Sequence, residues 1–145
     1  MRRRKDINIL LVNNNQTEVH CFKNLFGLVS SNVKVHIQKS ISDAFKYLII
    51  GCQFIAFPIP DLILIDAELL KADGEFLLRI RSNRRLKDIP LVILTAFENL
   101  HVYLPEMELS SVTFVSKPFD NKKLSEIIRK HFDIPKARSK YTPVH

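Results

Sequence analysis

The chain has 145 residues, of which 46% are hydrophobic and 26% are charged, and its formal net charge is +7. This length and composition are typical of one globular domain with a substantial core, and two cysteines exclude a disulfide framework. The positive charge gathers near both ends and around residues 79–87, without interleaved aromatic residues or a recognised nucleic-acid motif. Binding of nucleic acid is therefore not expected, although attraction to acidic partners stays open.

The N-terminal apolar run and the cysteines indicate the compartment. The run Ile7–Val12 is interrupted by Asn8 and is too short for a signal-peptide core or a membrane span. Cys21 and Cys52 lie in apolar helical patterns without metal-ligand spacing, so we expect reduced core thiols. The sequence thus predicts a cytoplasmic protein that does not engage a membrane.

The first half of the chain predicts two strands and two helices. A strand over 7–12 ends at Asn13-Asn14-Asn15, and a short alternating strand covers 33–37. Between them a helix over 16–29 carries apolar residues at helical spacing: Val19, Phe22, Phe26 and Val29, with Cys21, Leu25 and Leu28 widening the face. Ser40 and Asp43 have capping-box spacing and begin a helix that runs to about Cys52. In the connection 53–60, Phe54 and Phe57 are expected to pack against the margin of the sheet.

The second half continues the alternation. Residues 61–66 form a strand whose four apolar residues, 62–65, fit burial on both faces, and a loop over 68–72 follows. A helix after Asp73-Gly74 carries Phe76, Leu77, Leu78 and Ile80 and ends in the basic stretch 79–85. Strands are predicted over 89–95 and 112–116, with a helix over 97–108 that Pro105 should end or distort. Asp120 caps a last helix with inner residues Leu124, Ile127, Ile128 and Phe132.

Five strands alternating with five helices predict an α/β fold, a (βα)5 doubly wound parallel sheet. We expect a basic N-terminal extension over 1–6, one domain over 7–132 and a basic, mobile tail over 133–145. The candidate polar residues all fall at carboxyl ends of strands, where such sheets place their chemistry: Asn13, Asn14, Asp66, Thr95 and Lys117.

Four segments in this order resemble the receiver domain of two-component response regulators, the CheY-like family. They are Ile-Leu-Leu-Val-Asn-Asn-Asn (9–15), Pro-Asp-Leu-Ile-Leu-Ile-Asp (60–66) with Asp73-Gly74, Ile-Pro-Leu-Val-Ile-Leu-Thr-Ala (89–96) and Phe-Val-Ser-Lys-Pro-Phe (114–119). The resemblance covers about residues 7–132 and implies the flavodoxin-like strand order 2-1-3-4-5. It also implies a signalling domain without an output domain, rather than an enzyme.

The resemblance assigns roles residue by residue. Asp66 matches the aspartate that accepts a phosphoryl group, and Lys117 matches the lysine that pairs with phosphoryl oxygen. The Lys117–Pro118 bond is often cis in this family. Thr95 matches the hydroxyl that turns toward the phosphoryl group when the aspartate is phosphorylated. Phe114 matches the aromatic residue that switches between an exposed and a buried rotamer. Phosphoryl transfer needs such a carboxylate with positive charge placed on the spreading oxygens.

One departure concerns the metal. Where the family carries an acidic pair that binds Mg²⁺, this chain has Asn13 and Asn14. Mg²⁺ prefers charged oxygen ligands, so we expect weak binding through Asp66 and Asn14, with Glu68 either joining them or remaining a solvated loop carboxylate. Without a metal, Lys117 could form a salt bridge with Asp66 and hold one state.

Two functional readings therefore stay open within the family. In one, a sensor histidine kinase or a phosphotransfer protein phosphorylates Asp66, and a protein target is bound through the fourth predicted helix, fifth strand and fifth helix. In the other, the chain is an atypical interaction module that works without phosphorylation. A homodimer is open in both. A flavodoxin-like nucleotide or flavin binder would need glycines after the first strand, and Gly27, Gly51 and Gly74 all lie elsewhere.

Overall fold

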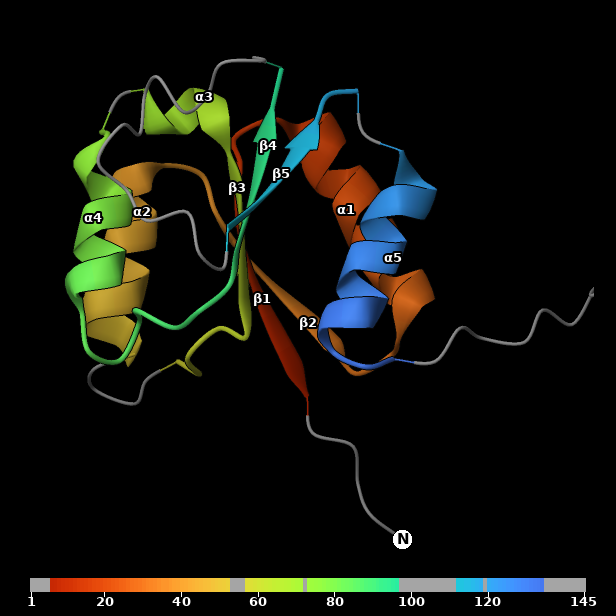
Figure 1. Cartoon of the computed structure of the whole chain (residues 1–145), viewed down its shortest axis with the longest axis horizontal. Helices are drawn as coiled ribbons and strands as arrows, with labels where there is room; N and C mark the ends of the chain where they lie inside the picture. The colour runs from red at the N-terminus through yellow and green to blue at the C-terminus, as the bar shows by residue number, and fades with distance from the viewer. Residues whose placement is uncertain (1–5, 53–56, 72, 97–111, 119, 135–145) are drawn as a thin grey trace, which may run out of the picture.

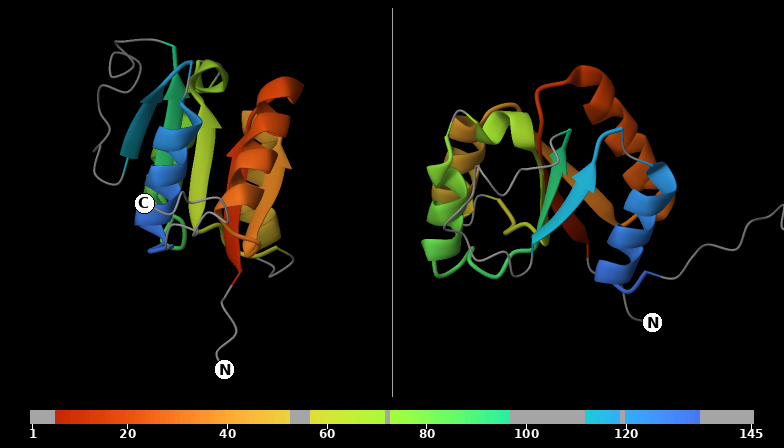
Figure 2. Two further views of the ribbon diagram at one scale, coloured as in Figure 1. Left: turned by 90° about the vertical axis from the view of Figure 1, so that its right-hand side faces the viewer. Right: turned by 45° about the horizontal axis from the view of Figure 1, so that its top comes forward.

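A parallel sheet of five strands forms the centre of the molecule in the computed structural model, which describes residues 6–52, 57–71, 73–96, 112–118 and 120–134. The strand order is β2-β1-β3-β4-β5, as the resemblance implied, and the left view of Figure 2 shows this order across the sheet. The strands are β1 (Ile7–Val12), β2 (Val33–Gln38), β3 (Leu62–Asp66), β4 (Leu91–Thr95) and β5 (Val112–Ser116). The predicted strands are confirmed, although β3 begins one residue later than predicted, β4 begins two residues later and β2 is one residue longer.

Helices cover both faces of the sheet (Figure 1). Helices α1 (Gln16–Val29) and α5 (Asn121–His131) lie on one face. The other face is covered by α2 (Ile41–Lys46), the π-helix η1 (Tyr47–Gly51) and α4 (Glu75–Ser82), with the short α3 (Ala67–Leu70) near the carboxyl edge. The doubly wound architecture is thus confirmed. No helix among the described residues is both long and apolar enough to cross a membrane.

Strand β3 lies at the centre of two hydrophobic clusters, one on each face of the sheet. Ile63 and Ile65 belong to the cluster under α2 and α4, whereas Leu62 and Leu64 belong to the cluster under α1 and α5. All four side chains are at most 1% exposed. The uninterrupted apolar run in the sequence is explained by this burial on both sides.

Helix α1 has the predicted bounds but a narrower apolar face than expected. Phe22, Phe26 and Val29 are buried, whereas Cys21 is exposed and Leu28 is 77% exposed. The predictions that Cys21 is a core thiol and that Leu28 widens the apolar face are therefore wrong. A helix that packs on a sheet buries one stripe of its surface, and residues at the margin of that stripe turn to solvent.

The helical segment after β2 changes its winding along its length. Ser40 caps it as predicted, since its hydroxyl accepts a hydrogen bond from the Asp43 backbone N–H at 3.0 Å. The α-helical turns then pass into η1. Phe57 stacks on Tyr47 with a centroid distance of 4.7 Å and stays 45% exposed, so it lies against this helical segment and not against the sheet margin. Phe54 lies outside the described residues.

Two further predictions are wrong, and others fall outside the described residues. The loop predicted over 68–72 begins as helix α3, because the Asp66 carboxylate caps it by accepting the Glu68 backbone N–H. Leu78 in α4 is 42% exposed and does not join the core with Phe76 and Leu77. The helix predicted over 97–108 and most of both terminal segments lie outside the described residues, whereas α5 is capped by Asp120 as expected.

Candidate functional site

The carboxyl ends of four strands, β1, β3, β4 and β5, meet at one edge of the sheet. In the strand register, Val12 of β1 lies beside Ile65, Asp66 lies beside Leu94, and Thr95 lies beside Ser116. Asn13, Asp66, Thr95 and Lys117 therefore converge, although they are far apart in the sequence. In the right view of Figure 2, this edge is turned toward the viewer.

Asp66 is a buried carboxylate with a partner on each oxygen. It is 5% exposed. Its Oδ1 accepts the Glu68 backbone N–H at 3.0 Å, and its Oδ2 accepts a hydrogen bond from Lys117 Nζ at 2.8 Å. Oδ1 thus helps to begin α3, while Oδ2 is directed to a cation.

Lys117 reaches Asp66 from the end of β5. Its backbone N–H donates to the Thr95 carbonyl at 2.8 Å, and the Lys117–Pro118 peptide bond is cis. Its Nζ contacts Asp66 at 2.8 Å and Glu18 at 3.2 Å. Burial alone would lower the pKa of Lys117, but the hydrogen bonds and charges of Asp66 and Glu18 outweigh it and raise the pKa above its ordinary value. The ammonium is therefore held in its charged form.

Glu18 belongs to the site, although the sequence-based prediction missed it. It comes from the first turn of α1, and its Oε1 accepts hydrogen bonds from Lys117 Nζ and, at 3.0 Å, from Asn13 Nδ2. The spacing of Asn15 and Glu18 was a usable signal, because an N-cap residue followed three positions later by Glu directs that Glu back toward the helix start. The ion pair with Lys117 joins residues 99 positions apart, which no local pattern could indicate.

The structure brings only some of the predicted metal ligands together. Asn14 is exposed, and the half-exposed Glu68 side chain pairs with Lys71 at 3.4 Å. Asn13 is fully buried, and its carbonyl Oδ1 accepts the Asn15 backbone N–H at 2.7 Å. Within the described residues, no three His, Cys, Asp or Glu side chains form a group that could hold a metal ion. This donor set fits Mg²⁺ poorly, since both nearby carboxylates already bind the Lys117 ammonium and the amide oxygen is used by the backbone.

The two predicted switch residues lie on neighbouring strands. Thr95 ends β4 and is 5% exposed. Phe114 of β5 is partly buried and packs against the cluster under α2 and α4. The structure thus places a hydroxyl near the carboxyl edge and an aromatic ring further down the adjacent strand.

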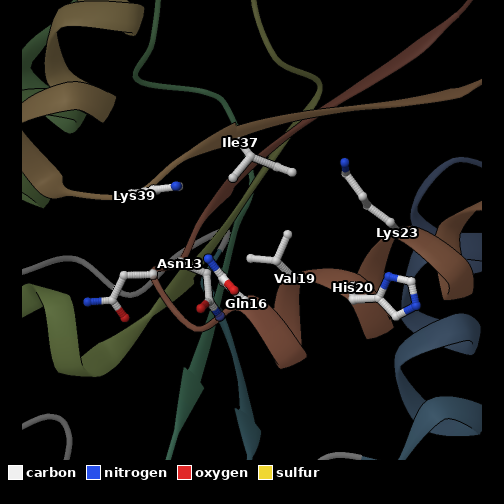
Figure 3. Close-up of a pocket in the computed structure, with 8 residues that line it drawn as sticks. Asn13, Gln16, Val19, His20, Lys23, Ile37 and Lys39 are labelled. Atoms are coloured by element: carbon white, nitrogen blue, oxygen red, sulfur yellow. The ribbon is translucent and has the colours of Figure 1, made fainter.

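A pocket of about 380 Å³ opens beside the site, between the start of α1 and the end of β2 (Figure 3). Asn13 lines both the pocket and the site. Lys23 and Lys39 extend from opposite sides of the pocket, with Val19 and Ile37 between them (Figure 3). The approach to the site on this side therefore carries positive charge.

A family model and two curated proteins of the same kind match this chain. The family model described as "Response regulator receiver domain" matches residues 9–129. The chain is 29% identical to the response regulator Rre1 of Synechocystis sp. over 101 residues, which are 69% of this chain and 41% of Rre1. It is 37% identical to Rcp1 of the same organism over 73 residues, half of each chain. The matched segments thus span half or less of these curated relatives.

Solved structures share the fold over most of the chain. The bacteriophytochrome response regulator RtBRR has a TM-score of 0.71 and 26% identity, and the match covers 96% of this chain and 85% of RtBRR. The phosphorylated cyanobacterial phytochrome response regulator RcpA has a TM-score of 0.67 and 26% identity, over 86% of this chain and 90% of RcpA.

Proposed function

Because this chain belongs to the response regulator receiver domain family, we propose that Asp66 accepts a phosphoryl group and that the domain signals through protein contacts. Members of this family are signalling phosphoacceptors of two-component systems rather than catalytic enzymes, and they pair with histidine kinases. The contact between Asp66 Oδ2 and Lys117 Nζ at 2.8 Å carries the proposal. It joins a buried carboxylate nucleophile to the cation that phosphoryl transfer requires.

In the proposed reaction, a carboxylate oxygen of Asp66 attacks the phosphorus of a phosphohistidine donor. A P–O bond forms as the P–N bond breaks, which leaves an acyl phosphate on Asp66 and returns the electron pair to the imidazole. Lys117 moves from the carboxylate to the phosphoryl oxygens and offsets their charge. The Thr95 hydroxyl hydrogen-bonds the same group, and Phe114 follows this movement as the switch residue.

Binding of Mg²⁺, which is typical of the family, is proposed to be weak in this chain. Asn13 and Asn14 stand where the family carries acidic residues, and Asn13 gives its amide oxygen to the Asn15 backbone N–H. Two missing carboxylates remove much of the attraction for a divalent cation. Lys117 supplies the positive charge that this chain itself places at the carboxylate.

The partners follow from this role. We take a sensor histidine kinase as the donor, and phytochrome-type kinases are the first to test, since RtBRR and RcpA are phytochrome response regulators. The target is proposed to bind the face that includes β5 and α5, as the resemblance implied. The helix predicted over 97–108, which was expected to belong to the same surface, lies outside the described residues. Because the curated relatives extend well beyond the matched segments, these partners are proposals for this chain alone.

One observation favours a second function. In the unmodified chain Lys117 already neutralises Asp66, which is the arrangement expected of an interaction module that holds one state without phosphorylation. This alternative predicts no phosphoryl adduct on Asp66.

Intact-mass spectrometry after incubation with a small phosphodonor and Mg²⁺ distinguishes the two functions. The proposed function predicts one added phosphoryl group in the wild type and none in Asp66→Asn. Asp133→Asn is a matched control, because Asp133 is exposed at a φ of 52°, a conformation that asparagine also adopts. An adduct that persists in Asp66→Asn, or its absence from the wild type, would contradict phosphorylation of Asp66.

A further inference from the structure

The Glu18 carboxylate lies at the centre of a small polar network. Its Oε1 accepts hydrogen bonds from Asn13 Nδ2 at 3.0 Å and Lys117 Nζ at 3.2 Å. The side chains of Glu18, Lys117 and Asp66 are 23%, 20% and 7% exposed, so the three charges are largely shielded from water. Asp66 and Glu18 thus hold one ammonium between them.

Asn13 determines where the Glu18 carboxylate goes. In a capping box, the Glu side chain would accept the N–H of the N-cap residue, here Asn15. That N–H donates instead to Asn13 Oδ1 at 2.7 Å. Glu18 is left to accept from the other end of the same amide, which turns its carboxylate toward Lys117. An aspartate at position 13 would place a second carboxylate against Glu18 and repel it.

We propose that Glu18 is the second carboxylate of this site and a positioning residue for Lys117, held in place by the Asn13 amide. The negative charge absent from the end of β1 is supplied by α1. When Asp66 becomes phosphorylated, the contact with Glu18 keeps the ammonium at the site while Lys117 shifts to the phosphoryl oxygens. The inference concerns the site described above, and its effect on phosphorylation rests on the proposed function.

The position of Lys117 can be measured without phosphorylation. Its side-chain ammonium should give a visible proton–nitrogen NMR signal in the wild type, because two carboxylates slow its exchange with water, and the signal is assigned by its loss in Lys117→Gln. We expect the signal to disappear in Glu18→Ala and in Glu18→Asp, whose shorter side chain keeps the charge but withdraws it from Lys117. Glu18→Gln should retain it, because the amide oxygen accepts at the same point. A wild-type signal in both Glu18→Ala and Glu18→Asp overturns the proposal.

Phosphorylation by a small phosphodonor provides the second measurement. Glu18→Ala and Glu18→Asp should slow formation of the adduct about tenfold, and Glu18→Gln should recover most of the rate, as expected for loss and rescue of positioning. Glu75→Gln is the control, since Glu75 pairs with Arg79 on an exposed face of α4. Unchanged or faster phosphorylation of Glu18→Ala also overturns the proposal. If the wild type takes up no phosphoryl group, the proposed function fails, and the Lys117 signal still decides the role of Glu18.

The pairing of Asn13 with Glu18 has its own test. Without Mg²⁺, Asn13→Asp should lower the urea midpoint of unfolding and abolish the Lys117 signal, because two carboxylates then face each other. Adding Glu18→Gln to Asn13→Asp should restore both. If the double variant recovers neither the urea midpoint nor the Lys117 signal, Asn13 does not hold Glu18.

Discussion

At the scale of single residues, the site depends on one side-chain amide that both donates and accepts a hydrogen bond. Asn13 is fully buried, and both ends of its side chain are used, one by the Asn15 backbone and the other by Glu18. A carboxylate has no N–H to donate, so an acidic residue here could not make both contacts. An aspartate at position 13 would therefore alter which groups meet Lys117 as well as the charge.

The Mg²⁺ affinity of the site is predicted to rise when the amides become acids. Replacing Asn13 and Asn14 together by Asp should increase the affinity about tenfold or more, because two added carboxylates attract a divalent cation. Isothermal calorimetry or a fluorescence titration with Mg²⁺ measures this directly. The wild type provides the baseline, and equal affinities would refute weakened metal binding.

At the scale of elements, the segment α2–η1 contains an unusual buried tyrosine. Tyr47 is 6% exposed, lies 5.9 Å from the His36 ring and stacks on Phe57, and its hydroxyl has no hydrogen-bond partner within the described part of the chain. Burial raises the pKa of Tyr47 to about 12, with a smaller contribution from the charge of Cys52. The passage from α-helical to π-helical winding begins at this residue.

This shift predicts a loss of stability at alkaline pH. The folded chain keeps Tyr47 neutral up to a pKa of about 12, whereas the ordinary pKa of 10.0 applies in the unfolded chain. Between these values the unfolded state has released the proton and the folded state has not, so the free energy of unfolding falls as pH rises. In Tyr47→Phe, the slope of the unfolding free energy against pH should become shallower by the amount that corresponds to release of about one proton on unfolding. At neutral pH, the same substitution should stabilise the fold by about 1 kcal/mol, because it removes a buried hydroxyl without a hydrogen-bond partner.

Urea denaturation of the wild type and Tyr47→Phe at several pH values between neutral and 12 measures both effects. Burial also raises the pKa of Cys52, so Cys52→Ala is included to separate its contribution. An alkaline slope that is the same in Tyr47→Phe as in the wild type would assign the loss to other groups.

At the scale of the whole molecule, stability comes from two clusters that share the central strands. Neighbouring residues of β3 belong to opposite clusters, as Leu64 and Ile65 show. The edge strand β2 is different, because Ile37 is only partly buried. Each central strand therefore contributes to both layers, whereas an edge strand contributes less.

Alanine substitutions should reveal this difference. Leu64→Ala and Ile65→Ala are each expected to lower the free energy of unfolding by about 2–5 kcal/mol, since each leaves a cavity on its own face. Ile37→Ala removes the same atoms as Ile65→Ala at a partly exposed position, and should cost about half as much or less. Urea denaturation gives the three values. Equal losses for Ile37→Ala and Ile65→Ala would contradict the larger contribution of the central strand β3 to stability.

The architecture and the family were accessible from local patterns. The apolar run 62–65 predicts a strand buried on both faces, the helical spacing over 16–29 predicts α1, and the order of the four segments led to the family that the comparisons confirm. These signals are read from neighbouring residues, because hydrophobic periodicity follows directly from the geometry of helices and strands. The convergence of Asp66 with Lys117 also followed once a parallel sheet was assumed.

Contacts between side chains distant in sequence were decided by the tertiary structure alone. Periodicity cannot tell where the buried stripe of α1 ends, and so Cys21 and Leu28 were assigned to a core from which the sheet excludes them. Glu18 resembles an ordinary first-turn acid until the fold brings Lys117, 99 residues away, to its carboxylate. Burial and charge pairing depend on which helices and strands pack against a residue. This packing is determined by the assembly of the sheet with its helices and not by the neighbouring residues along the chain.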